Sequence, residues 1–408
     1  MLAACTLLLT VFTYYVYSRG EGGFATSDRK YYVLLFAVFI RLLAAGFIET
    51  DNYMWTDYTQ RTLEYGYPRA SGDPLYYSYW ADKNSLNVFV QHPPLAFYLY
   101  APVVGLSVHA ASLLNMLFFV LGIHVLWNFL ERRHSDPLLP SLLYLTFPLF
   151  YLESVSLFSF ITLTMSVLLV GLVNYVEYSE SRKPEHLSKM VFCFAAALVI
   201  DYTAVIILLF LSVHMLFKNR RMLRETAVVL AVVWMPFVLW NLYTGFPMFH
   251  NYGFTYVFAH HFNDNLPYGE AVRQYYSWHS GGLSAYFMDT PMFAAINLLI
   301  FLNLNIALLG KGRFQELKHV LAATVILQAL LLTYYAVVRY QSHPIANYIR
   351  YIMPAAFCLI PLSLRVGFDG KYKRLAQATI LLNLVFILYV LWSNQFQWVT
   401  IEWTRFVG

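Results

Sequence analysis

The sequence predicts an all-α polytopic membrane protein with about 11 to 12 transmembrane or half-membrane helices. Three observations predict it: the composition, the recurring apolar runs and the sorting of basic residues. Of the 408 residues, 59% are hydrophobic, 18% aromatic and only 12% charged, which is far from the composition of a soluble domain. Apolar runs of about 16 to 25 residues recur along the chain, and a helix of that length crosses a hydrocarbon core of about 30 Å.

The runs define twelve spans within a single transmembrane domain over residues 1–408. The first has neither a basic leading segment nor a small-residue cleavage site, so we expect it to be retained. Arg19 follows it, which puts the N-terminus outside by the positive-inside rule. The predicted spans are residues 2–17, 31–48, 110–130, 137–152, 155–176, 191–200, 203–217, 226–243, 286–309, 320–338, 351–366 and 375–392.

The basic residues are sorted along the chain in step with these spans. Alternation from an outer N-terminus assigns six loops to the cytoplasm, and they contain 19 of the 27 Lys and Arg residues. Because the basic residues are spread over short loops, the net charge of +5 indicates topology and not nucleic-acid binding. The six loops are residues 18–30, 131–136, 177–189, 218–224, 310–319 and 365–374.

The apolar stretch 191–217 has the length of one crossing, yet basic loops flank it on both sides. A hairpin of two short half-helices that turns near Asp201 satisfies the charge rule. A single tilted span is the alternative, and it would invert every later loop.

Two predicted outer segments, 49–93 and 244–285, are too long to be mere connectors, so we expect function there. Asp51 directly follows a span, where partial desolvation makes a carboxylate a stronger base. The second segment is interpreted as a lid over an active cavity. The first segment begins with six acids in about 35 residues, namely Glu49, Asp51, Asp57, Glu64, Asp73 and Asp82.

Short motifs follow one another in a definite order. Aromatic Trp55 and Tyr58 follow Asp51, and then come His92-Pro93-Pro94-Leu95 and a segment with small residues at 107–115. Late in the chain, residues 347–354 contain Arg350-Tyr351 and Pro354 at the start of a span. In order and spacing this set resembles the C-type (GT-C) superfamily of membrane glycosyltransferases. The similar group within it comprises the dolichyl-phosphate-mannose protein mannosyltransferases and the aminoarabinose transferases.

The resemblance implies an inverting hexosyl transfer from a polyprenyl- or dolichyl-phosphate sugar, mannosyltransferase-like, on the extracytoplasmic side. One carboxylate would take the proton of the acceptor hydroxyl, and a cationic site would hold the leaving phosphate. The implied catalytic acids are Asp51, as the base, and Asp57. The candidates for binding the donor phosphate are Arg350, His92, Lys83 and Arg339, and those for the substrate pocket are Trp55, Tyr58 and His343.

We expect no required cofactor. Histidines of the second outer segment leave a divalent metal ion open as an alternative, although no His-Glu-x-x-His spacing occurs. The three cysteines all lie in apolar runs, which indicates neither a disulfide framework nor a metal cluster.

A transporter or flippase of lipid-linked saccharides is the alternative function, and a noncatalytic membrane assembly subunit is a third. A transporter should place paired ions or broken helices near the midplane, whereas here Asp201 is the one acid inside an apolar run. The expected partners are a polyprenyl-phosphate-linked sugar, an acceptor protein, lipid or glycan, and the lipid bilayer, without nucleic acid. The expected location is the plasma membrane of a prokaryote or the endoplasmic reticulum membrane of a eukaryote.

Overall fold

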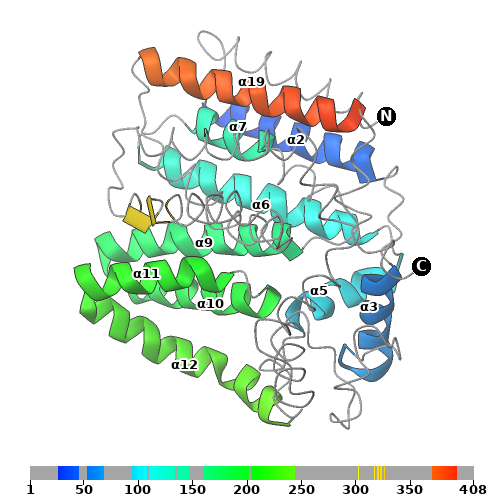
Figure 1. Cartoon of the computed structure of the whole chain (residues 1–408), viewed down its shortest axis with the longest axis vertical. Coiled ribbons are helices and arrows are strands. Elements are labelled where there is room, and N and C mark those ends of the chain that lie inside the picture. The colour runs from blue at the N-terminus through cyan, green and yellow to red at the C-terminus, as the bar shows by residue number, and fades with distance from the viewer. Residues whose placement is uncertain are drawn as a thin grey trace, which may run out of the picture.

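The computed structural model describes ten helices and a few further positions, and every regular element among the described residues is α-helical. Figure 1 shows most of them running side by side as a bundle, with the short α3 and α5 together at one end. The described residues are 26–45, 53–68, 94–107, 110–133, 137–147, 160–201, 204–243, 302, 317, 319–320, 322–323, 326 and 370–392. The helices are α2 (Thr26–Ala45), α3 (Tyr53–Tyr65), α5 (Leu95–Val104), α6 (Ala111–Glu131), α7 (Leu138–Thr146), α9 (Phe160–Ser181), α10 (Pro184–Ile200), α11 (Ala204–Lys218), α12 (Arg220–Tyr243) and α19 (Gly370–Trp392).

Helix α9 forms the centre of the bundle, with α6 and α10 packed against it. Among the described residues, α6 and α9 are the two helices long and apolar enough to cross a membrane. Their surroundings differ, because 83% of the apolar window of α9 is buried in the protein, against 44% for α6. The apolar side chains of α9 are thus covered by other parts of the protein on nearly all sides, whereas α6 has one apolar face outside the bundle.

Two glycines allow the closest helix contacts. A Cβ atom at Gly171 of α9 would lie 2.6 Å from the Phe194 ring of α10 and 3.2 Å from Cβ of Cys193. A Cβ atom at Gly122 of α6 would lie 2.6 Å from the hydroxyl of Tyr144 on α7. Both contacts are buried, so the neighbouring helices can approach this closely only where no side chain intervenes.

The stretch 191–217 is broken into α10 and α11, with Asp201 between them in extended conformation. The start of α10 lies beside the end of α9, since Nδ1 of His186 is 3.0 Å from Oδ1 of Asn174. The end of α11 lies there too, since the Tyr175 hydroxyl is 2.7 Å from Nδ1 of His214. The two helices therefore form a hairpin that turns near Asp201, as predicted, and not one continuous helix. They are not the short half-helices expected, because α10 begins at Pro184 and has 17 residues.

Polar bonds join helices at one end of the bundle. Lys30 at the start of α2 donates to Asn128 near the end of α6. Arg133 after α6 donates to Glu180 of α9 at 2.8 Å, and Tyr178 of α9 donates to a carboxylate near the start of α12. We call the end of the bundle that contains Lys30, Arg133 and Tyr178 the basic end. The described parts of four predicted cytoplasmic loops, residues 26–30, 131–133, 177–189 and 218–224, thus lie at one end of the bundle, while the cytoplasmic location of all six loops stays a prediction.

Helix boundaries differ from the predicted spans mainly at the basic end. Helix α12 begins at Arg220, before the predicted span 226–243, and α9 continues to Ser181, beyond the predicted end at 176. Charged and polar residues there extend the helices because they are good helix formers with access to water. Two helices were not predicted at all: α3 inside the outer segment 49–93 and α5 directly after it.

The contact at Gly171 predicts a specific sensitivity. We expect Gly171→Ala to lower the free energy of unfolding by roughly 1–3 kcal/mol, because the added methyl group overpacks the Phe194 ring. Thermal unfolding of the purified protein measures the loss. In a Phe194→Leu background the cost of the alanine should fall, and an equal cost in both backgrounds would show that the ring is not what opposes the methyl group.

Candidate functional site

The end of the bundle opposite the basic end contains α3, the polar helix of the first outer segment. Helix α3 stops at Gly66, whose φ of +77° is a left-handed conformation that glycine adopts without steric cost. The Gly66 amide donates to the Thr62 carbonyl at 3.0 Å, and the Gly66 carbonyl accepts a bond of 2.7 Å from the Tyr98 hydroxyl of α5. These bonds tie the end of α3 to α5.

Tyr58 anchors α3 to the bundle. Its side chain is 1% exposed and meets the Phe97 ring edge to face at 6.1 Å between centroids. Phe97 in turn packs on Phe160, the first residue of α9, at 5.4 Å. We call this cluster the aromatic end; its further buried members are Ala96, Tyr100, Val104, Ala111, Leu163 and Ile200.

Asp57 precedes this anchor and forms an ion pair one helical turn along α3. Nε of Arg61 donates to Oδ2 of Asp57 at 2.9 Å, and both side chains are partly exposed. Because successive residues on a helix point about 100° apart, burying Tyr58 fixes the direction of its neighbour Asp57. The pair therefore presents an oriented carboxylate beside a guanidinium at the surface of the aromatic end.

Buried polar groups lie within the same end of the bundle. The Tyr100 hydroxyl donates to Oδ1 of Asn115, and both residues are buried. Thr62 of α3 donates to the Tyr58 carbonyl at 2.7 Å. Asp201, at the tip of the α10–α11 hairpin, is 6% exposed and directly follows Ile200 of the aromatic cluster. This end of the bundle thus combines apolar packing with internal hydrogen bonding.

The predicted site residues divide into those the structure describes and those it does not. Asp57 and Tyr58 lie together on α3, the former at the surface and the latter in the core. Trp55 lies in the same helix, but its side chain is outside what the structure describes. The other predicted residues are outside the described residues, namely Asp51, Lys83, His92, Arg339, His343 and Arg350.

One interaction at this site was not predicted from the sequence. Arg61 was not predicted to contribute, although its position four residues after Asp57 is the spacing at which opposite charges meet on a helix. The signal was present once residues 53–65 were recognised as helical. Tyr58, predicted as a substrate-pocket residue, occupies a packing position in which its ring contacts other aromatic side chains.

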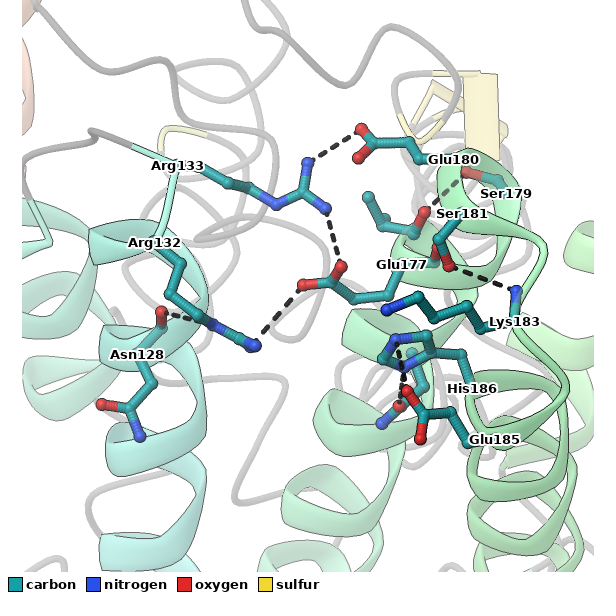
Figure 2. A network of polar contacts seen from close by, with 12 residues as sticks. Asn128, Arg132, Arg133, Glu177, Ser179, Glu180, Ser181, Lys183, Glu185 and His186 are labelled. Carbon is teal, nitrogen blue, oxygen red and sulfur yellow. Dashed lines mark hydrogen bonds and ion pairs between the residues drawn. The ribbon is translucent and has the colours of Figure 1, made fainter.

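A second polar cluster lies at the basic end (Figure 2). The Arg133 side chain is only 9% exposed and bridges Glu177, at 3.3 Å, and Glu180, at 2.8 Å. Its guanidinium also lies 4.5 Å from the centre of the Phe129 ring. Arg132, 64% exposed, reaches Glu177 at 3.5 Å. Each of these charges has an opposite charge beside it, so this cluster ties α6 to α9.

The same end contains a perturbed carboxyl group. The pKa of Glu225 lies below its usual range, because the Tyr178 hydroxyl and then Arg221 donate hydrogen bonds to the carboxylate. Glu225 precedes the predicted span 226–243. Because the pKa of Glu225 is lower in the folded protein than in the unfolded chain, the ionised carboxylate stabilises the fold at pH values above its unfolded-state pKa. This stabilisation is lost as the pH falls through the folded-state pKa.

Neither cluster contains a recognisable metal centre: among the described residues, no three His, Cys, Asp or Glu side chains group so as to hold an ion. The chain matches no protein-family model and no curated protein.

We expect Gly66→Ala to destabilise the protein by about 1 kcal/mol, because alanine is strained at a positive φ. The space around an added Cβ is open, so any loss comes from the backbone. Gly105→Ala is the control, because this glycine has an ordinary helical φ of −60°. Its added Cβ would lie 3.3 Å from Cδ1 of Leu63, the end of a side chain that can shift, so this variant should cost less. Thermal unfolding of both variants makes the comparison.

The two neighbouring arginines at the basic end should respond differently to substitution. Arg133→Gln should lower the free energy of unfolding by roughly 1–3 kcal/mol, because it removes the largely buried guanidinium that bridges Glu177 and Glu180 and leaves Glu177 with the exposed Arg132 alone. Arg132→Gln should change it by less than about 0.5 kcal/mol, because exposed ion pairs contribute little. Chemical denaturation of both variants tests this, and equal losses would contradict the assignment of Arg133 as the link between α6 and α9.

Proposed function

We propose that the protein is a multi-pass membrane glycosyltransferase that transfers a sugar from a polyprenyl-phosphate donor to an acceptor hydroxyl on the extracytoplasmic side. The observation that carries the proposal is the placement of α3. This polar helix holds an oriented carboxylate, Asp57, at the end of an apolar bundle opposite the end at which the basic residues gather.

Outward-facing apolar side chains support a multi-pass arrangement. Leu35 and Phe39 of α2 are 65% and 49% exposed, and Leu117 and Leu121 of α6 are 60% and 44% exposed. Helices α11, α12 and α19 also present large apolar side chains outside the bundle. A water-soluble protein rarely exposes apolar surface on so many helices, whereas hydrocarbon solvates it.

The charge asymmetry supports the orientation. Lys and Arg collect on the cytoplasmic side of membrane proteins, so the basic end is the cytoplasmic candidate and α3 then faces outward. The described cytoplasmic connections are short, for instance the single residue Asn219 between α11 and α12. They offer little surface for a nucleotide sugar, which favours an activated isoprenoid that reaches the site through the membrane.

The reaction needs a base and a site for the leaving phosphate. A carboxylate takes the proton of the acceptor hydroxyl, whose oxygen forms a bond to the anomeric carbon with inversion. The bond from that carbon to the phosphate oxygen breaks, and polyprenyl phosphate leaves with the electron pair. We assign the base to Asp51, two residues before α3, and a supporting role to Asp57. Arg350 is the first candidate for the phosphate, because a guanidinium donates two parallel hydrogen bonds.

The position of the helix break favours this enzyme over a transporter. Transporters use broken helices near the membrane midplane. Here α10 has 17 residues, about 25 Å of helix, before the break at Asp201, and Ile200 at its end packs in the aromatic cluster. The break therefore lies at one end of the bundle and not half-way along it.

Substitution of the acids tests the assignment. In membranes supplied with a labelled polyprenyl-phosphate sugar, we expect Asp51→Asn to lower transfer to an acceptor by a factor of about 100 to 10,000, the contribution of general base catalysis. Asp57→Asn should lower it by a factor of up to about 100, because the ion pair that orients this segment of α3 is lost.

Asp28→Asn is the matched control, since it removes an exposed carboxylate from the start of α2 at the opposite end of the bundle. It should leave transfer unchanged. Full transfer by Asp51→Asn would remove the assignment of the base. Movement of the lipid-linked sugar across the membrane without transfer would replace the enzyme with a transporter.

A further inference from the structure

Helix α12 has one face that remains outside the bundle along its whole described length. At about 100° per residue, seven positions of α12 lie within about a third of the helix circumference and so share one face. They are residues 220, 224, 228, 232, 235, 239 and 242. The apolar residues on this face, Val228, Val232, Met235, Leu239 and Leu242, are 50% to 68% exposed. We call this surface the α12 face.

The α12 face is basic at one end and apolar along the rest. Arg220 and Arg224 lie one turn from each other, and the apolar stretch begins with Val228 after a further turn. Nε of Arg220 donates to the Leu216 carbonyl at 3.4 Å, so this side chain lies against the last turn of α11. Arg221 pairs with Glu225 at 2.8 Å, the one acid in α12.

Helix α11, which packs against α12, also has an apolar face outside the bundle. Val205, Leu209, Val213 and Leu216 of α11 are 44% to 61% exposed, and α11 packs along α12 in the hairpin joined at Asn219. Figure 1 shows this pair of helices at the outside of the bundle. Two arginines one helical turn apart, followed by an apolar face about 20 Å long on α12, match the polarity of a phospholipid with its headgroup at one end and acyl chains along the rest.

We propose that the α12 face binds an acidic phospholipid of the leaflet at the basic end, with its phosphate at Arg220 and Arg224 and an acyl chain along Val228 and Val232. The inference rests on the membrane location in the proposed function, and not on sugar transfer. Charge complementarity favours this occupant, because two guanidinium groups at the end of an apolar face attract an anionic headgroup and gain little from a zwitterionic one.

A second copy of the chain fits this face less well. Copies in one membrane have the same orientation, so a symmetric pair would be related by a twofold axis along the membrane normal. With that symmetry, residues of the two copies that meet lie at the same depth in the membrane. Arg220 and Arg224 of one copy would then face the same arginines of the other. Like charges in such an arrangement repel, whereas an anionic lipid neutralises them.

Native mass spectrometry of the full chain in mild detergent tests the proposal. Phosphatidylglycerol and phosphatidylcholine with identical acyl chains are added in equal amounts, and bound lipid is counted. We expect the wild-type protein to bind phosphatidylglycerol preferentially. Arg220→Gln with Arg224→Gln should weaken that binding about 25-fold, or about fivefold for each basic residue removed. Arg220→Lys with Arg224→Lys keeps both charges and should stay within about threefold of wild type.

Lys183→Gln with Lys189→Gln is the matched control, because it removes two exposed charges at the same end, from residues beside and within α10. It should leave the preference unchanged. The proposal is overturned if the arginine double variant binds phosphatidylglycerol as the wild type does, or if the lysine control loses the same amount. A dimer that Val232→Arg dissociates would overturn it as well, because the face would then be covered by a second copy. Sugar transfer by Asp51→Asn is independent of every one of these outcomes.

Discussion

The sorting of charge to the helix ends is the constraint on which the described bundle depends, and it is the sorting that the proposed hydrocarbon surroundings would require, because ionised side chains are costly there. Charged residues gather at helix ends, where Arg133 reaches two carboxylates and Lys30 reaches an amide oxygen. The middles of the helices are left apolar.

Close packing then fixes which helices are neighbours. Helix α9 is largely buried, and it can serve as a centre because Gly171 allows α10 to approach it directly. Helix α10 turns at Asp201 and returns as α11, so that α10 begins and α11 ends beside the last turns of α9. The polar bonds at the basic end hold this arrangement, since they join residues that are distant in the sequence.

Much of this architecture could be predicted from hydrophobic runs and basic loops. The predicted spans 31–48, 110–130, 226–243 and 375–392 overlap α2, α6, α12 and α19, and the hairpin near Asp201 followed from the length of its apolar stretch and the basic loops on both sides. Helix α3 could not be found this way, because its residues are mostly polar and no apolar run marks it. Helix α5 was missed for a different reason: it has only ten residues, and Pro94 and Pro102 interrupt the pattern.

The candidate site was predicted less completely than the fold, since residue type does not determine which side of a helix is buried. Asp57 and Tyr58 were both predicted to act on substrate, yet adjacent positions on a helix point in different directions. Because Tyr58 faces the core, the adjacent Asp57 points in another direction. The burial of the tyrosine gives the aspartate a fixed direction relative to α5 and α9. A buried residue can thus set the direction of the one beside it, which only the packing of α3 against the bundle reveals.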